Sequence, residues 1–247
     1  MPLRPLLPLL LLLGACSRPD APASTTSSAR APAPPAPAAA AAKAPVQPAG
    51  SALAKPPAPK PARALEPDAT APLRLPGRGE PAALAKRVLH VGDSMVPLVG
   101  NYLRPVFEKR GASYAMVSTH SSSTRTWAAD DKLDAALKEH APELVLISLG
   151  SNELFDKDLA AIADAVRAIV ERVGDRACLW IAPPAWAKDF GFAEVVRKNA
   201  SPCRYFDSTK LKFTRQEDGR HPDWSSSYGW ARQVYAALGG TDPLPKN

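Results

Sequence analysis

Apolar runs and helix-spaced apolar residues alternate along the chain from residue 87 onward, and this alternation restricts the fold more than any other feature. Leu144–Leu149 is continuously apolar, as expected for a strand covered on both faces. Val96–Arg110 instead places its apolar residues at helical spacing. The alternation predicts an α/β domain with a doubly wound, mostly parallel sheet and helices on both faces. The expected strands are Arg87–Val91, Tyr114–Ser118, Leu144–Leu149, Leu179–Ala182 and Tyr205–Asp207, and the expected helices are Val96–Arg110, Trp127–His140, Asp158–Val173 and Ser226–Leu238.

Proline is distributed unevenly, and its distribution separates this region from what precedes it. Of the 28 prolines, 19 fall in residues 1–86. Residues 17–84 are rich in Ala and Pro, and they carry too few large apolar side chains to offset the entropy of ordering them. We therefore expect residues 17–84 to be a disordered linker and residues 85–240 to form one domain.

The first sixteen residues have the organisation of an export signal. A basic start at Arg4 precedes a short apolar run, Leu6–Leu13, which is too brief to span a bilayer as a helix. The run ends in LGAC, which resembles a bacterial lipobox and implies cleavage before Cys16 and lipidation of that residue. Ser17 follows where an inner-membrane lipoprotein often carries aspartate, which favours the outer membrane, facing the periplasm or the cell surface. A plain secretory signal is the alternative.

Two cysteines remain in the exported part of the chain. Cys178 begins an expected strand and Cys203 precedes another, so we expect a disulfide that closes the loop between them. A catalytic thiol is the less favoured alternative. The spacing of the pair and the lack of a CxxC motif do not indicate a metal or redox site.

The charge of the expected domain is nearly balanced. Residues 87–247 hold 21 Lys and Arg against 20 Asp and Glu, whereas the whole chain has a formal net charge of +7. The domain shows no basic stripe with interleaved aromatic residues, so we expect no nucleic-acid partner. The excess positive charge lies mainly in the linker, which could contact anionic wall polymer or lipid headgroups.

Polar residues follow several of the expected strands. In a doubly wound sheet, ligands bind at the carboxyl ends of the strands, so these residues are expected to meet at one edge. They are Gly92-Asp93-Ser94 after the first strand, Ser118–Ser123 after the second, Gly150–Glu153 after the central strand, and Asp218–His221 before the last helix.

These residue types permit acyl transfer. A serine hydroxyl is a weak nucleophile at neutral pH and needs a base, so we assign Ser94 as nucleophile and His221 as the base. Asp218 can accept the second ring N–H of His221 and hold its tautomer. The Ser94 backbone N–H and the Asn152 amide are suitable oxyanion donors. Ser94 also stands where it could cap the helix that follows.

The motifs GDS at 92–94, GSN at 150–152 and DGRH at 218–221 together resemble the SGNH (GDSL) hydrolase superfamily in order and spacing. The resemblance covers nearly all of residues 87–240. It implies a flavodoxin-like three-layer α/β/α sandwich and esterase activity without a metal or another cofactor. It also implies that Ser94, Asp218 and His221 form the catalytic set and that Asn152 is an oxyanion donor.

One loop departs from the family pattern. The family usually has a glycine after its second strand, whose N–H is a third oxyanion donor, but this loop reads STHSSSTRT. The N–H of Ser121, Ser122 or Ser123 could take that role, and we assign it to Ser122. A side chain at this position would narrow the pocket or change its shape.

Four neighbouring side chains have structural interpretations. Asp93 is expected to hydrogen-bond within its turn and position adjacent loops. Glu153 is expected to line the pocket or hold a loop. His90 lies within a strand and is interpreted as a hydrogen-bonded core histidine, while His120 is interpreted as lining the pocket.

Taken together, the sequence predicts a lipid-anchored, monomeric serine ester hydrolase. Its expected substrate is an O-acetyl ester on cell-envelope carbohydrate, such as an acetylated polysaccharide or peptidoglycan, and Trp186 and Trp224 could stack on a sugar ring. The alternatives are an O-acetyltransferase that uses the same residues, a lipase, or a catalytically silent carbohydrate-binding or scaffolding protein with this fold.

Overall fold

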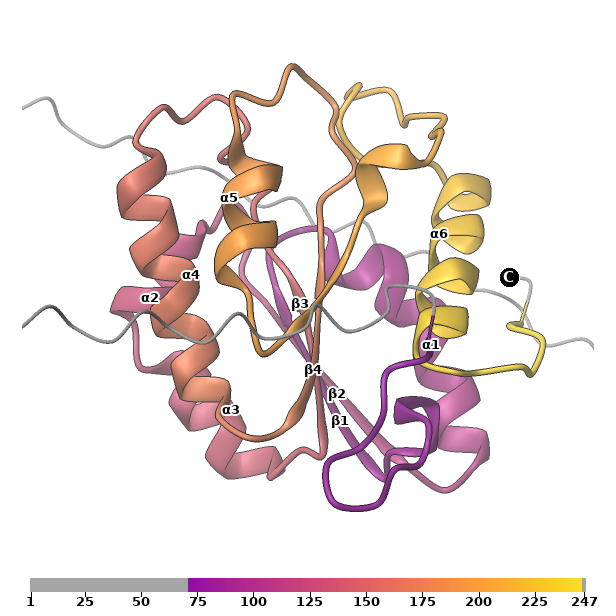
Figure 1. The fold of residues 1–247 in the computed structure, drawn as a ribbon. Helices are drawn as coiled ribbons and strands as arrows, with labels where there is room; N and C mark the ends of the chain where they lie inside the picture. Colours follow the sequence, from indigo (N-terminus) through magenta and orange to yellow (C-terminus); the bar gives the residue numbers. More distant parts are fainter. Residues whose placement is uncertain (1–70, 246–247) are drawn as a thin grey trace, which may run out of the picture. The chain divides into compact units, whose positions relative to one another are not determined.

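The computed structural model describes residues 71–245, which form a parallel sheet flanked by helices (Figure 1). The five strands lie in the order β2-β1-β3-β4-β5, and every neighbouring pair is parallel. The predicted α/β fold class is therefore confirmed. The strands are β1 (Arg87–Gly92), β2 (Ser113–Ser118), β3 (Leu144–Ser148), β4 (Ala177–Ile181) and β5 (Arg204–Phe206).

The helices cover both faces of the sheet and produce three layers. One face packs on α1 (Val96–Lys109) and α6 (Trp224–Ala237) through a core that includes Leu144, Leu146 and Trp230. The other face carries α2 (Thr124–Ala129), α3 (Lys132–His140), α4 (Leu159–Val173) and α5 (Phe192–Asn199). Successive residues of β3 point to opposite faces, so Val145 and Ile147 belong to this second core. Every residue of β3 is buried, as expected for a strand covered on both faces.

The chain direction places a topological switch point between β1 and β3. From β1 the chain passes to β2 on one side and then to β3 on the other, so the connections diverge at this point. The two strands end side by side, with Gly92 in register with Ser148. Ligands in open α/β sheets bind at such a position, which places the loops after β1 and β3 at the expected site.

One helix prediction requires correction, and one helix was not predicted. The expected single helix Trp127–His140 is two helices, α2 and α3, separated at Asp130, whose backbone is extended. A capping box between Ser123 and Thr126 starts α2 earlier than the apolar spacing suggested. The sequence pattern missed α5, whose first turn is held by Asp189, a carboxylate that accepts the N–H groups of residues 191–193.

The domain extends further in both directions than the predicted 85–240. Leu75 is 3% exposed and packs in the α1/α6 core. The Leu73 N–H donates to Ala237 O over 2.9 Å, and the Ala83 N–H donates to Leu238 O over 2.8 Å. At the other end, Leu244 is also buried in this core. Residues 71–84 are therefore part of the domain and not of a linker, which corrects that boundary.

The predicted signal peptide at 1–16, the lipidation site at Cys16 and the rest of the predicted linker lie outside the described residues. Within residues 71–245, no helix is both long and apolar enough to cross a membrane.

The predicted disulfide is confirmed. Cys178 and Cys203 are bonded, and their Cα atoms are 4.7 Å apart. The bond joins the second residue of β4 to the residue before β5, so it ties the edge strand and the α5 region to the sheet.

Candidate active site

The nucleophile turn is shaped by the close approach of β1 and β3. Gly92 has φ of 149°, and a Cβ atom there would lie 1.9 Å from Ser148 O, so only glycine fits. The chain then turns at Asp93, whose N–H donates to Ser148 O over 2.9 Å. This turn presents Ser94, half-buried, at the carboxyl edge of the sheet.

The expected helix-capping role of Ser94 is wrong. The residue at the N-cap of α1 is Met95, and its N–H donates over 2.9 Å to the carboxylate of Asp93. The Ser94 hydroxyl is instead 2.8 Å from His221 Nε2. The Asp93 carboxylate thus accepts an N–H group at the start of α1, and the Ser94 hydroxyl can contact His221 instead.

His221 is fixed by the loop that precedes α6. Its Nδ1 contacts Asp218 Oδ2, and its backbone N–H donates to Asp218 Oδ1 over 3.0 Å. The Arg220 N–H donates to the same oxygen over 2.8 Å. With Nδ1 protonated toward Asp218, Nε2 carries the lone pair that accepts the Ser94 hydroxyl proton. Ser94, His221 and Asp218, predicted from separate segments, therefore form one continuous chain of hydrogen bonds.

Asp218 stays ionised in this arrangement. The hydrogen bond from the His221 side chain, followed by the two backbone N–H groups, holds the pKa of the Asp218 carboxyl well below its ordinary range. A carboxylate at this position favours the protonated imidazole that forms when His221 takes a proton.

The N–H groups of two predicted oxyanion donors, Ser94 and Asn152, have different surroundings. Within residues 71–245 the Ser94 N–H has no hydrogen-bond acceptor, so it is free to bind a substrate oxygen. Asn152 is exposed, and its Nδ2 donates to Ser122 O over 3.0 Å. Because an amide nitrogen carries two protons, one N–H of Asn152 is oriented by Ser122 while the second remains for an oxyanion.

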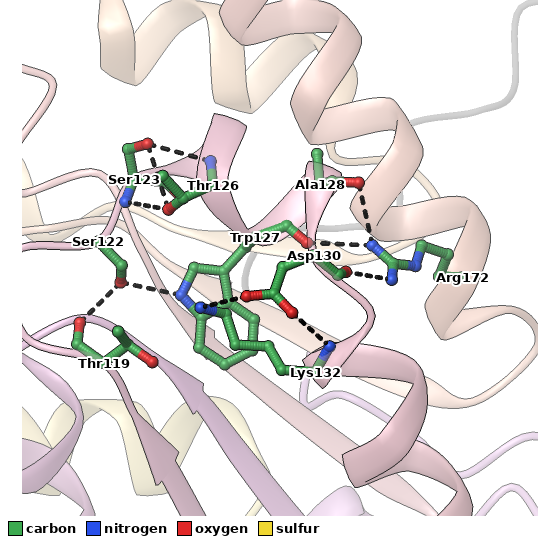
Figure 2. A network of polar contacts seen from close by, with 9 residues as sticks. All are labelled: Thr119, Ser122, Ser123, Thr126, Trp127, Ala128, Asp130, Lys132 and Arg172. Carbon is green, nitrogen blue, oxygen red and sulfur yellow. Dashed lines mark hydrogen bonds and ion pairs between the residues drawn. The ribbon is translucent and has the colours of Figure 1, made fainter.

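Ser122 itself belongs to the loop after β2 and takes part in a network of polar contacts (Figure 2). Its hydroxyl donates to Thr119 O over 2.7 Å and accepts Trp127 Nε1–H over 2.9 Å. Its N–H makes a long turn contact of 3.3 Å with Thr119 O. The side chain therefore anchors the loop to α2, and the carbonyl orients Asn152. Its assignment as the third oxyanion donor stays a prediction.

Two buried carboxylates hold the loops together. Asp93 Oδ2 accepts the N–H and the hydroxyl of Ser151 over 3.1 and 2.7 Å, which confirms the expected positioning contacts. Glu153 accepts the N–H and the hydroxyl of Thr124, both over 2.7 Å, so it holds the start of α2. Burial raises the pKa of both carboxyls, and the hydrogen bonds that they accept oppose this rise.

His90 has the surroundings expected of a hydrogen-bonded core histidine. His90 is fully buried, with Nδ1 3.0 Å from the Tyr114 hydroxyl and Nε2 2.9 Å from Ser148 Oγ. Burial lowers the pKa of His90 to about 3, so it is neutral at physiological pH. His120 is exposed, and its ring centroid lies 6.3 Å from that of His221.

Aromatic side chains extend from the site along the loops after β3 and β4. Trp186 Nε1–H donates to Ser151 O over 2.9 Å, so its indole is fixed beside Asn152. Phe155 and Phe190, which the sequence analysis missed, continue from it and are 52% and 41% exposed. Trp224, at the first turn of α6, is 65% exposed. An apolar residue in a polar loop was the only sequence signal available for the two phenylalanines.

No group of three or more His, Cys, Asp or Glu side chains that could hold a metal ion occurs in the part of the chain that the structure describes.

Comparison with known proteins agrees with the fold. No protein-family model matches the chain, and no curated protein matches its sequence. Among solved structures, a lipase/acylhydrolase from Enterococcus faecalis matches with a TM-score of 0.50 at 15% identity, covering 65% of this chain and 98% of that one. TesA matches at 21% identity with a TM-score of 0.49, and the match covers 61% of this chain and 97% of that one. The psychrotrophic esterase EstA from Pseudoalteromonas sp. matches at 15% identity with a TM-score of 0.45, and the match covers 62% of this chain and 97% of that one.

The likeness to the Enterococcus structure shows that the chain shares its α/β fold. At their TM-scores the other two matches add nothing to this. The catalytic roles that the sequence motifs assign to Ser94, Asn152, Asp218 and His221 stay predictions.

Proposed function

We propose that the protein is a serine ester hydrolase. The observation that carries the proposal is the 2.8 Å contact between Ser94 Oγ and His221 Nε2, continued through Nδ1 to Asp218. A hydroxyl, an imidazole and a carboxylate in this order form the arrangement that activates a serine for attack on an acyl carbon.

In the first half of the reaction, Ser94 Oγ attacks the ester carbonyl while His221 Nε2 takes the hydroxyl proton. Asp218 stabilises the resulting imidazolium. The negative charge that develops on the carbonyl oxygen is held by the Ser94 N–H and by the free amide N–H of Asn152. Collapse of the tetrahedral intermediate breaks the ester bond, and His221 returns its proton to the departing alcohol oxygen.

In the second half, water replaces the alcohol. His221 takes a proton from the water, whose oxygen attacks the acyl carbon of the acyl-Ser94 intermediate. The same donors hold the second oxyanion. Collapse of this intermediate releases the carboxylic acid, and the proton on His221 returns to Ser94 Oγ, which restores the resting state.

We further propose that the substrate is an O-acetyl ester of cell-envelope carbohydrate and that the enzyme is anchored to the outer membrane through lipidated Cys16. The export signal, the LGAC sequence and the Ala/Pro-rich segment support this location. An aromatic surface beside Asn152 supports a sugar-bearing alcohol group, because exposed aromatic rings can pack on the apolar faces of sugars. If an alcohol replaced water in the second half-reaction, the same residues would transfer the acetyl group.

The test is hydrolysis of p-nitrophenyl acetate and p-nitrophenyl octanoate by the full chain, purified in detergent, and by its Ser94→Ala variant. We expect Ser94→Ala to lower kcat by at least about 10⁴-fold, as removal of a catalytic serine does. Ser113→Ala, at the exposed start of β2, is the control and should keep full activity.

Equal rates for Ser94→Ala and the unaltered protein would contradict the nucleophile assignment and favour a silent binding protein. A preference for octanoate over acetate would support a lipase and contradict the acetylesterase assignment.

A further inference from the structure

We propose that the aromatic surface beside the catalytic residues binds an anionic glycan, so that the preferred substrate is an acetyl ester on an acidic polysaccharide. This inference rests on the proposed ester hydrolysis and specifies its substrate. The surface, called here the aromatic strip, consists of Trp186, Phe155 and Phe190.

The aromatic strip starts at the catalytic loops and runs away from them. Trp186 is fixed to the carbonyl of Ser151, the neighbour of Asn152. The Phe155 ring meets the Trp186 ring edge to face, with centroids 5.3 Å apart, and the Phe190 centroid is 6.5 Å from that of Phe155. A polymer whose ester carbonyl lies at Ser94 can therefore extend its chain along three rings in succession.

Cations border the strip along its length. The Arg220 guanidinium lies 4.6 Å from the Trp186 ring centroid, directly after Asp218-Gly219 and before His221 in the chain. Lys157 and Lys188 place their ammonium groups 5.7 and 5.2 Å from the Phe190 centroid. These contacts hold the long side chains against the rings, so less conformational freedom is lost when they bind a ligand.

The carboxylates nearest in sequence to these cations are used elsewhere. Asp189 accepts the N–H groups at the start of α5. Asp156 pairs with Arg125, Asp158 accepts the N–H of Ala161 at the start of α4, and Asp218 holds His221. Within residues 71–245, neither Arg220, Lys157 nor Lys188 forms an ion pair. The strip therefore offers three uncompensated positive charges to a ligand.

The exposed rings and the cations of the aromatic strip together indicate its ligand. A neutral glycan would need bare ring faces, whereas here cations lie over Trp186 and Phe190 and are themselves exposed. Carboxylate or phosphate groups repeated along a polymer would pair with these cations while its sugar rings contact Phe155, which is the most exposed of the three rings. An acidic polysaccharide satisfies both requirements.

The experiment compares acetate release from a chemically O-acetylated polyuronate and from an O-acetylated neutral glucan of matched length and acetylation. The variant, called here the strip variant, carries Lys157→Gln and Lys188→Gln in the full chain. The control is Lys109→Gln with Lys138→Gln, which removes the same charge at the last turns of α1 and α3.

We expect the unaltered protein to prefer the polyuronate and the strip variant to lose about three- to tenfold in kcat/KM for it, with p-nitrophenyl acetate unchanged. Raising the salt concentration should shrink the preference, because exposed charges are screened. The same kcat/KM for both polymers, or an equal loss in the control variant, would overturn the inference.

A binding measurement separates this inference from the proposed function. In a Ser94→Ala background, affinity for non-acetylated polyuronate should fall about three- to tenfold in the strip variant. If p-nitrophenyl acetate were not hydrolysed and this difference persisted, the proposed activity would fail and the glycan site would stand. If the strip variant lost binding to vesicles containing phosphatidylglycerol but not to polyuronate, the strip would be a membrane-contacting surface and the inference would be wrong.

Discussion

The buried carboxylate of Asp93 accepts both the backbone N–H and the hydroxyl of Ser151. The same side chain accepts the N–H of Met95 through its other oxygen. One residue therefore couples the turn that carries the nucleophile to the loop that carries Asn152. The distance between the attacking oxygen and the oxyanion donors depends on this coupling.

Asp93→Asn should weaken both the structure and the activity. An amide has one acceptor oxygen, so its nitrogen would face either Met95 N–H or the Ser151 donors and leave a buried donor without a partner. Such a loss costs about 1–3 kcal/mol, and the same cost in the transition state lowers kcat by roughly ten- to a hundredfold. Urea unfolding and kcat for p-nitrophenyl acetate measure the two effects.

The control for this substitution is Asp175→Asn, which changes an exposed aspartate in the turn before β4. It should leave both quantities within about twofold or 0.5 kcal/mol. If Asp93→Asn behaved in the same way, the loop-coupling role would be excluded.

Asn152→Ala should act on the rate and only weakly on substrate binding. It removes a donor that binds the oxygen more tightly once charge develops on it, so we expect kcat to fall by about 10²–10³-fold and KM to change little. Ser123→Ala is the matched control: it removes the cap of α2, at a cost of about 1 kcal/mol in stability, without touching an oxyanion donor. A loss confined to KM would show that Asn152 binds the ground state and the transition state equally, which would contradict its assignment as an oxyanion donor.

The pH dependence of kcat/KM should show one protonation on its acid side. Because the pKa of Asp218 is held well below its ordinary value, Asp218 stays ionised until the pH is far below neutral and adds no second protonation to the acid side of the profile. The rate should therefore fall tenfold per pH unit as the pH decreases, and no faster. A slope of two would show that a second group must also be deprotonated.

The same pKa shift has a defined sign for stability. The folded chain binds a proton at Asp218 less readily than the unfolded chain does, so this contribution is present above about pH 4, the ordinary pKa of aspartate, and is lost as the pH falls below it. Asp218→Asn should remove that dependence and lower kcat by about 10⁴-fold. Unfolding midpoints of both proteins between pH 2 and pH 6, compared as a difference, measure the first effect.

The disulfide should contribute substantially to stability. Cys178 and Cys203 are 25 residues apart, and closing a loop of that length corresponds to about 3.5 kcal/mol in the chain-entropy description. Cys178→Ala with Cys203→Ala should therefore unfold at lower denaturant concentration. Reductant should shift the unfolding of the unaltered protein and not that of the variant. Equal midpoints for the unaltered protein with and without reductant would exclude the contribution.

More of the candidate site than of the detailed fold could be predicted from the sequence. Parallel strands bring their carboxyl ends to one edge, so short motifs after strands locate Ser94 and Asn152 without any knowledge of packing. His221 and Asp218 are three residues apart, so their contact depends only on the local conformation of one loop. These relationships depend on chain direction and short loops, and both can be read from the sequence.

Other features depend on contacts that no local pattern contains. The start of α5 relies on Asp189, a residue outside the helix. The order of residues 71–84 relies on backbone hydrogen bonds to the end of α6. Ser94 fails to cap α1 because a neighbouring carboxylate takes the N–H. The exposed rings Phe155 and Phe190 meet only because two loops, more than thirty residues apart in the chain, fold against each other.

The position of residues 71–84 decides on which side of the sheet the chain enters the domain. They hydrogen-bond to the end of α6 and, through the contact of Ala71 O with Arg204, to the first residue of β5. The nucleophile and its partners stand at the other ends of the strands. The described chain therefore begins on the side of the domain opposite to Ser94, away from the groups that would meet an ester.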